Sequence, residues 1–409
     1  MATRKNTITQ ISNELELGLL NRTAGEIIRH DTRLPQGRRL GLVHEVNRRH
    51  VFEMNISKKP GLASLNAAGE RDVRSAIRLA AANGSDGKVY GGGAVLNNTQ
   101  GLIPAPYRTT TISAAFGRAM LGVKSQQIVI GVANEDDAFK VNELTRLMGP
   151  VILAISASSP FRFEGKNLVN TGLNSIRMEE YARGCARFPS SMWNTPSNMN
   201  SLAEYNRELA SASRELRRRL DEGEMDATPE FFTQKGSDGR LFSDFSVLSP
   251  HQIFWQVRVR PDHANSECAM SIEVRMPDMP FSMAEVQTIN RFVYGLACAA
   301  VLSVYAVNVP LSLDGSFAQL QEAGANGLDA RIGHQDMRQL VTWGRDTAES
   351  GLDLAGLRSE AVLLRKGIDE ILAQGNGAQR MLRVMGKDPT PQRLRDAAVK
   401  ILQRGWENA

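Results

Sequence analysis

Cysteine is scarce in this chain of 409 residues, where only Cys185, Cys268 and Cys298 occur. An odd number of cysteines at such wide spacing forms neither a disulfide framework nor a zinc-binding motif. The first ten residues include Arg4 and Lys5, but no apolar stretch follows them, as a secretory signal would require. We therefore expect a protein of the reducing cytoplasm.

The sequence also lacks long apolar runs, a large excess of positive or negative charge, and clusters of aromatic residues. The longest apolar run, residues 292–307, is too short to cross a bilayer comfortably and is expected to form a buried helix. Lys and Arg number 49 against 44 Asp and Glu, which gives a net charge of +5, and aromatic residues make up 6%. This charge is scattered and no stacking cluster accompanies it, so we expect neither a membrane nor a nucleic-acid partner.

The common catalytic motifs are absent as well. Residues 84–88 read Gly-Ser-Asp-Gly-Lys, which lacks the spacing and the final Ser or Thr of a phosphate-binding loop, and the glycines at 91–93 form no dinucleotide fingerprint. The six histidines never have metalloprotease spacing, and no Gly-x-Ser-x-Gly elbow occurs. Hydrolases and Rossmann-type enzymes are therefore disfavoured.

What is present is a pattern of strands and helices with 42% hydrophobic residues, enough for a sizeable core. Alternating apolar and polar residues predict strands, and apolar residues three or four apart predict helices. The predicted strands are residues 7–17, 50–56, 128–132, 253–258 and 271–275. The predicted helices are residues 65–83, 136–147 and 202–220, followed by an almost wholly helical chain after residue 282. We interpret the polar stretch 190–244 as an insertion.

Carboxylates occur in apolar strand contexts, where a charge without a partner would be costly. Residues two apart on a strand project from the same face. Three predicted strands carry such pairs: Glu14 with Glu16, Glu53 with Asn55, and Glu273 with Arg275. If these faces converge, their oxygen atoms suit a hard cation such as Mg2+, with a nucleotide as its natural companion. The alternative is a solvent-facing sheet surface with cross-strand pairs only.

Several segments, taken in order, resemble the type 2 glutamate–cysteine ligases, also called carboxylate–amine ligases. Asn13-Glu14-Leu15-Glu16-Leu17, Phe52-Glu53-Met54-Asn55 and the stretch from Leu153 to Phe161 are similar to family segments. The similarity continues through Gly165, Thr171-Gly172-Leu173-Asn174-Ser175-Ile176-Arg177, Ile272-Glu273-Val274-Arg275 and Gly327-Leu328-Asp329-Ala330. It covers most of residues 7–375, with the polar stretch 190–244 and the final helix outside it.

This resemblance implies an α+β protein of the glutamine-synthetase-like fold, in which a curved antiparallel sheet forms a funnel flanked by helices. It implies a ligase-like catalytic domain over residues 1–345, a helical C-terminal cap over 346–409, and a possible homo-oligomer. Such enzymes use ATP and Mg2+ to phosphorylate a small carboxylate, and an amine then attacks the acyl phosphate to give an amide.

The resemblance also implies roles for individual residues. The expected Mg2+ ligands are Glu14, Glu16, Glu53 and Glu273. Arg177 would bind the substrate carboxylate or the transferring phosphoryl group, and Arg275 would add positive charge along the phosphate path. The expected nucleotide contacts are Glu14, Glu53, Asn55, Gln127 and Arg258.

Two departures from the family pattern leave two hypotheses open. The family commonly has a histidine where this chain has Val129, in Gln127-Ile128-Val129-Ile130-Gly131, and an arginine where it has Ala325. Valine can neither ligate a metal nor hydrogen-bond a phosphate. The first hypothesis is an active ligase of altered specificity, whose carboxylate and amine the sequence does not identify. The second is a non-catalytic descendant that keeps the fold as a binding or structural protein.

Overall fold

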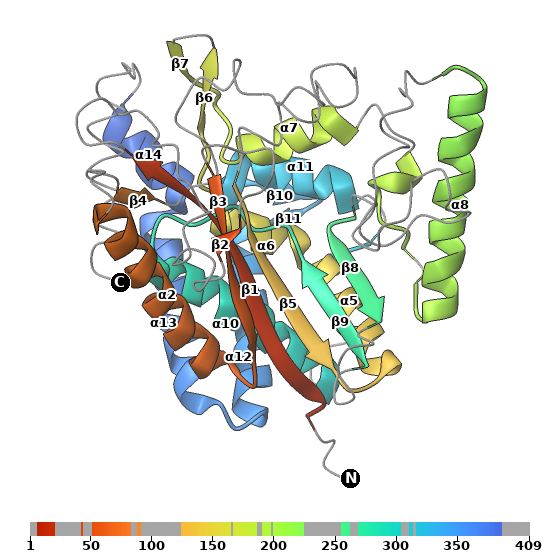
Figure 1. The fold of residues 1–409 in the computed structure, drawn as a ribbon, viewed down its shortest axis with the longest axis horizontal. Helices are drawn as coiled ribbons and strands as arrows, with labels where there is room; N and C mark the ends of the chain where they lie inside the picture. The colour runs from red at the N-terminus through yellow and green to blue at the C-terminus, as the bar shows by residue number, and fades with distance from the viewer. Residues whose placement is uncertain are drawn as a thin grey trace.

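An antiparallel sheet of seven strands forms the centre of the protein (Figure 1). The computed structural model describes residues 6–20, 42–43, 51–82, 88–90, 124–164, 167–185, 190–197, 199–224, 255–261, 269–303, 311–313 and 316–386. The main strands, in sheet order, are β2 (Leu42–Val43), β3 (Val51–Lys59), β1 (Ile8–Leu20), β5 (Gln126–Val132), β9 (Met270–Val274) and β8 (Val257–Pro261). The short strand β4 (Lys88–Tyr90) also pairs with β1.

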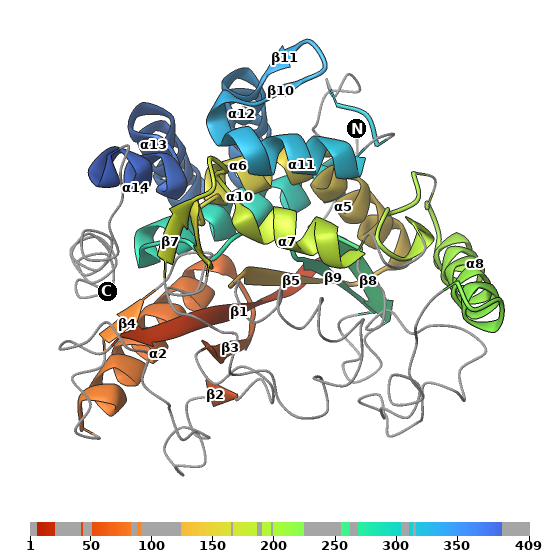
Figure 2. The same cartoon turned by 90° about the horizontal axis from the view of Figure 1, so that it is seen from above.

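Helices cover one face of this sheet (Figure 2). The helices that contact the sheet are α2 (Leu62–Ala82), α5 (Glu135–Leu147) and α10 (Met283–Leu302). Behind α10 lie α6 (Gly149–Ser156), α12 (Met337–Leu354) and α13 (Arg358–Gln374). The remaining helices are α7 (Ile176–Cys185), η1 (Ser190–Met192), α8 (Leu202–Asp221), α11 (Ser316–Asn326), η4 (Gly327–Asp329) and α14 (Gly377–Met385). Two short antiparallel pairs complete the described elements: β6 (Phe161–Glu164) with β7 (Asn167–Asn170), and β10 (Arg331–Ile332) with β11 (Gln335–Asp336).

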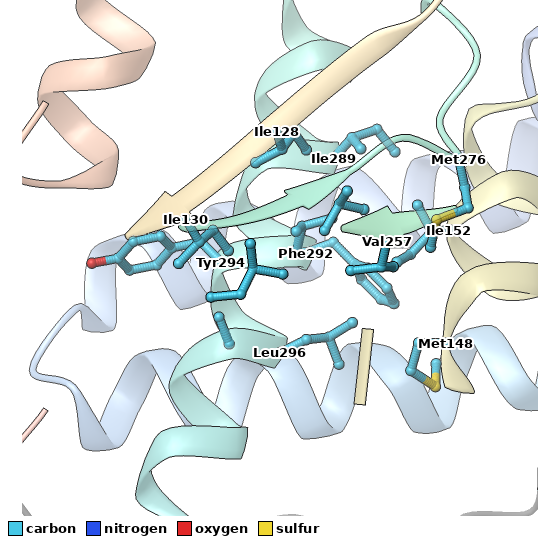
Figure 3. Close-up of a cluster of buried hydrophobic side chains, with 14 of the residues drawn as sticks. Ile128, Ile130, Met148, Ile152, Val257, Met276, Ile289, Phe292, Tyr294 and Leu296 are labelled. Carbon is cyan, nitrogen blue, oxygen red and sulfur yellow. The ribbon is translucent and has the colours of Figure 1, made fainter. Parts of the chain in front are cut away.

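The core forms between the helices and every second residue of each central strand. Ile11, Leu15 and Leu17 of β1 are fully buried on the helix side. Figure 3 shows apolar side chains of β5 and β8 pointing toward those of α10. The contributing residues are Ile128, Ile130 and Val257 from the sheet and Ile289, Phe292 and Leu296 from α10. This alternation leaves the other residues of the same strands for the opposite face.

Helix α10 is the longest buried helix of the described part of the chain, and its ends are capped. Ser282 accepts a hydrogen bond from the backbone N–H of Glu285, and the C-cap residue Ser303 has a φ of 56°, in the left-handed region. Gly295 allows α10 and α12 to pack closely, because a Cβ at this position would lie 2.5 Å from the carbonyl oxygen of Ala348. The expected buried helix at 292–307 is therefore confirmed, although it begins earlier and ends at Leu302.

Helix α8, from the predicted polar insertion, covers the edge of the sheet at β8. Tyr205 of α8 is fully buried, and its hydroxyl accepts a hydrogen bond from the backbone N–H of Val259 at 3.3 Å. Its ring packs edge-on against Trp255 at 5.1 Å. This hydrogen bond satisfies an outward-facing donor of the edge strand, which would otherwise be open to pairing with another chain.

The predicted fold class is confirmed: the protein is α+β, with an open antiparallel sheet flanked by helices. The division at residue 345 falls within α12 and stays a prediction. The C-terminal segment is less peripheral than a cap would be, because Asn376 is fully buried and its amide donates to the carbonyl oxygen of Ala154 at 2.9 Å. Within the described residues, no helix is long and apolar enough to cross a membrane.

Candidate functional site

The face of the sheet opposite the helices carries polar residues from five neighbouring strands, and we call it the polar face. Glu14 and Glu16 of β1 alternate with the buried residues Asn13, Leu15 and Leu17, so they project to this face. The strand register places Gln127 of β5 opposite Glu14, and Val129 of the same strand opposite Glu273 of β9. Arg258 of β8 is also opposite Glu273. Strands distant in sequence thus bring the predicted site residues together.

The backbone of β3 completes one side of this arrangement. Glu53 pairs with Glu16, and Asn55 pairs with Glu14. The Asn55 side chain is exposed, whereas the side chain of Glu53 lies outside the described part of the structure. We call Glu14, Glu16 and Glu53 the acidic half of the polar face.

Glu16 is the more buried of the two described carboxylates in the acidic half. It is 3% exposed, and one of its oxygens, Oε2, accepts hydrogen bonds from the backbone N–H of Ser125 at 2.5 Å and from the Ser125 hydroxyl at 2.9 Å. Lys124, the preceding residue, is fully buried. Burial lowers the pKa of its ammonium well below the usual value, and the opposite charge of Glu16 offsets part of this shift. Ser125 therefore fixes the position of a predicted metal ligand.

Three arginines surround Glu273 at the other end of the polar face, and we call Arg258, Arg260 and Arg275 the arginine half. The Nη2 atom of Arg260 is 2.8 Å from Oε2 of Glu273. The Nε atom of Arg275 and the Nη1 atom of Arg258 are 3.3 Å and 4.0 Å from its Oε1. Three guanidinium groups against one carboxylate leave positive charge in excess, which suits an anion.

Burial distinguishes Arg258 of the arginine half from an arginine on the protein surface. Arg258 is 6% exposed, and its pKa is lowered to about 9, first by burial and then by the charge of Arg275, while Glu273 opposes the shift. Water solvates the charge of a buried guanidinium poorly. Binding of an anionic ligand that pairs with the guanidinium and hydrogen-bonds to it is therefore favoured.

Gln127 connects the two halves of the polar face. Its Nε2 donates to Oε1 of Glu14 at 2.6 Å, and its Oε1 accepts from Nε of Arg275 at 3.3 Å. Arg275 in turn contacts Glu273. A continuous polar network therefore runs from β1 through β5 to β9 and β8.

Arg177 of α7 lies at the end of β9, where it binds backbone. Its Nη2 donates to the carbonyl oxygen of Arg275 at 2.7 Å, and its Nη1 to that of Met276 at 2.9 Å. Burial lowers the pKa of Arg177, while Asp278 and then Glu16 raise it. These contacts hold the guanidinium of Arg177 against the backbone after β9, and its predicted direct contact with substrate stays a prediction.

Asp278 is a fully buried acid beside Arg177 that the sequence patterns did not reveal. Its oxygens accept from the hydroxyls of Ser159 at 2.8 Å and Ser175 at 2.9 Å, and from the backbone N–H of Ser158 at 3.1 Å. Burial raises the pKa of this carboxyl, and Arg177 is the largest opposing influence. Asp278 thereby joins the loop after α6 to the start of α7.

Ser125 and Lys124 were also missed, because they precede the apolar pattern of β5. The sequence signal for them was weak: a charged residue and a hydroxyl residue directly before the apolar pattern, followed by Gln126 and Gln127. For Asp278, the signal was an acid between two Met-Pro pairs, in a segment that follows β9. Gly165 of the family resemblance lies outside the described residues.

The two departures from the family pattern occupy different places. Val129 is half-buried on the polar face, between Ser12 of β1 and Glu273 of β9 in the strand register. Ala325 lies near the end of α11, where its carbonyl oxygen accepts from the backbone N–H and from the side-chain amide of Asn174, each at 3.1 Å. An apolar side chain therefore sits in the middle of the polar face.

The oxygen donors of the acidic half fit Mg2+, which prefers carboxylates, water and phosphate oxygens. No group of three or more His, Cys, Asp or Glu that could hold a metal occurs among the side chains that the structure describes. Mg2+ in nucleotide enzymes is commonly held by one or two carboxylates together with water and phosphates. Glu14 and Glu16 offer two carboxylates on one face of β1.

Comparison with known proteins identifies the family. The family model for glutamate–cysteine ligase family 2 matches residues 7–400 of this chain. The chain belongs to glutamate–cysteine ligase family 2. The match extends the expected resemblance beyond residue 375, to residue 400. No curated protein matches the sequence.

Solved structures show that this family 2 member shares its fold with two bacterial proteins. A glutamate–cysteine ligase from Francisella tularensis, solved in complex with AMP, has a TM-score of 0.62 at 11% identity, covering 99% of this chain and 90% of that chain. A bifunctional glutathione synthetase from Pasteurella multocida has a TM-score of 0.60 at 13% identity, covering 98% of this chain and 53% of that chain. This chain thus spans about half the length of the Pasteurella protein. Family membership supports a ligase of the carboxylate–amine type.

Proposed function

We propose that this chain is an ATP- and Mg2+-dependent ligase that joins a small carboxylate to an amine through an acyl phosphate. The observation that carries the proposal is the division of one sheet face into an acidic half and an arginine half, linked by Gln127. Membership of the family supports it, and so does the AMP bound to the Francisella tularensis enzyme of the same fold.

In this proposal the acidic half binds Mg2+ and the nucleotide. Glu14 and Glu16 ligate Mg2+, with Glu53 opposite Glu16 in the register, and Asn55 contacts the nucleotide. When bound, Mg2+ neutralises charge on the phosphate oxygens. Glu273 is a poorer candidate for Mg2+ than Glu14, because its carboxylate already lies within ion-pair distance of three arginines.

The arginine half then faces the transferring phosphoryl group. Arg275 and Arg258 stabilise its oxygens, and Glu273 holds their guanidinium groups in place. Arg177 acts through the backbone, because it binds the carbonyl oxygen of Arg275. Its effect on the reaction is therefore to keep Arg275 in position.

The reaction has two steps. An oxygen of the substrate carboxylate attacks the γ-phosphorus of ATP, the bond to the bridging oxygen breaks, and ADP leaves. The amine nitrogen then attacks the acyl carbon, phosphate departs, and the amine loses a proton to give the amide. The protein contributes positioning and charge neutralisation, as is usual in phosphoryl transfer.

Two residues favour the alternative of a non-catalytic family member. Val129 occupies the middle of the polar face, where the family commonly has a histidine, and it cannot contact a cation or a phosphate. Ala325 likewise stands where the family has an arginine. A protein of this kind would keep the fold and lose the response to nucleotide.

Thermal unfolding with and without MgATP separates the two functions without knowledge of the substrates. A ligand that binds only the folded protein raises its melting temperature. We expect MgATP to stabilise the wild type and to stabilise Glu14→Gln and Glu53→Gln much less. Glu208→Gln on the outer helix α8 is the matched control and should respond as the wild type does.

Ligase activity is tested next by measuring the release of ADP and phosphate from ATP. The release should require both a carboxylate and an amine. Stabilisation that Glu14→Gln abolishes, followed by such release, supports the ligase. A wild type that ignores millimolar MgATP contradicts the proposed function and favours the non-catalytic alternative.

A further inference from the structure

Gln127 hydrogen-bonds to both the acidic half and the arginine half of the polar face. It is 8% exposed on β5, between Glu14 of β1 and Arg275, which follows β9. Its amide nitrogen contacts Glu14 at 2.6 Å and its amide oxygen contacts Arg275 at 3.3 Å. One short side chain therefore spans the boundary between opposite charges.

The chemistry of its neighbours fixes the orientation of this amide. A carboxylate only accepts hydrogen bonds and a guanidinium only donates them. The amide serves both neighbours in one orientation, with its nitrogen toward Glu14 and its oxygen toward Arg275. The reverse orientation would set oxygen against oxygen and nitrogen against nitrogen, which removes both bonds.

We propose that Gln127 is a positioning residue that makes cation binding by the acidic half and anion binding by the arginine half depend on one another. This inference rests on the proposed function, because it concerns the two ligands of that same site. A cation on Glu14 withdraws electron density from the oxygen that Gln127 binds, and the change passes through the amide to the guanidinium of Arg275. The two half-sites are then coupled by a physical chain of hydrogen bonds.

Two substitutions of similar length give opposite signatures. Gln127→Glu adds a negative charge beside Glu14, which favours a cation, and the same charge neutralises Arg275, which disfavours an anion. Gln127→Met removes both hydrogen bonds and adds no charge, so both ligands bind less tightly. General damage to the fold would instead weaken both ligands in both variants.

The experiment uses the full chain, with Mn2+ as the cation probe and inorganic phosphate as the anion probe. Free Mn2+ is counted by electron paramagnetic resonance, and phosphate binding is measured by calorimetry with and without saturating Mn2+. In Gln127→Glu we expect Mn2+ to bind about fivefold more tightly and phosphate about fivefold less tightly. In Gln127→Met, both should weaken, and the effect of Mn2+ on phosphate binding should shrink.

Gln10→Glu is the matched control, because it adds the same charge near the start of β1, away from Glu14 and Arg275. If Gln127→Glu shifts both affinities in the same direction, or no more than Gln10→Glu does, the inference is overturned while the proposed function stands. If the wild type binds neither Mn2+ nor phosphate, the proposed function itself is overturned, and the inference with it. Circular dichroism of each variant identifies any that fail to fold. If only Gln127→Met folds, the effect of Mn2+ on its phosphate binding decides: an effect as large as in the wild type overturns the inference.

Discussion

Both hydrogen-bond donors of Ser125 reach the same oxygen of Glu16, the backbone N–H at 2.5 Å and the hydroxyl at 2.9 Å. The two residues are separated by 109 positions in the sequence. Charge-assisted hydrogen bonds of this kind are stronger than bonds between neutral groups. Ser125 therefore restricts where a predicted Mg2+ ligand can lie.

Ser125→Ala tests this restriction. We expect the variant to lose about 1 kcal/mol of unfolding free energy, because a buried carboxylate loses the hydroxyl donor of Ser125. The stabilisation by MgATP should fall as well, since the carboxylate is less well positioned. Thermal unfolding at a series of MgATP concentrations measures both effects. Ser213→Ala on α8, whose hydroxyl binds the carbonyl oxygen of Leu209, is the control and should leave the nucleotide response unchanged.

Tyr205→Phe tests the cover that α8 provides for the edge of the sheet. Phenylalanine keeps the ring contacts with Trp255 and Phe139 but removes the acceptor for the N–H of Val259. We expect a loss of about 1 kcal/mol near neutral pH, measured by urea unfolding. An unchanged stability would mean that this hydrogen bond contributes nothing to the edge.

The same variant has a pH signature. Burial raises the pKa of Tyr205 to about 12, from an ordinary value of 10.0. Between these values the unfolded chain loses the tyrosine proton and the folded chain keeps it, so the stability contributed by Tyr205 falls as the pH rises. The advantage of the wild type over Tyr205→Phe should therefore shrink by about 1 kcal/mol between about pH 10 and 11. A constant difference across this range would refute the assignment.

The ion pair between Arg291 of α10 and Glu360 of α13 offers a further prediction. Its Nε–Oε2 distance is 2.7 Å, and each side chain is 10% exposed. Arg291→Met leaves a buried carboxylate without its cation and should cost about 3–5 kcal/mol of unfolding free energy. The double variant Arg291→Met with Glu360→Leu should recover most of that loss, because both charges are gone.

Urea unfolding of the two single variants and the double variant measures the coupling. A double variant whose loss equals the sum of the single losses would show that the two charges do not interact. Arg365→Met at the more exposed pair with Glu349 is the control and should change stability little.

The local pattern of the sequence was enough to place most of the predicted strands and helices. Alternation in residues 7–17 and 271–275 reflects one apolar and one polar face of β1 and β9, and this period is a local property. The same alternation put Glu14 and Glu16 on a single face. The family resemblance added the expected fold, which the family match and the solved structures confirm.

The assembly of the site depended on long-range pairing that local patterns do not encode. The bond from Gln127 to Glu14 joins residues 113 positions apart, and that from Arg275 to Gln127 spans 148 positions. Register between distant strands is set by the packing of whole faces against the helices, so no single segment determines it. Ser125 and Asp278 likewise join the site only through long-range contacts, with Glu16 and with Arg177.

The amino-acid sequence alone specifies which residues of each strand are polar, that α10 is apolar along its length, and that the acids and arginines of the polar face are present. The folded chain adds that Glu273 lies among three arginines, that Arg177 binds the backbone, and that Gln127 stands between opposite charges. The two differ because polarity is a property of one side chain, whereas its charged neighbours are fixed only when distant strands pair.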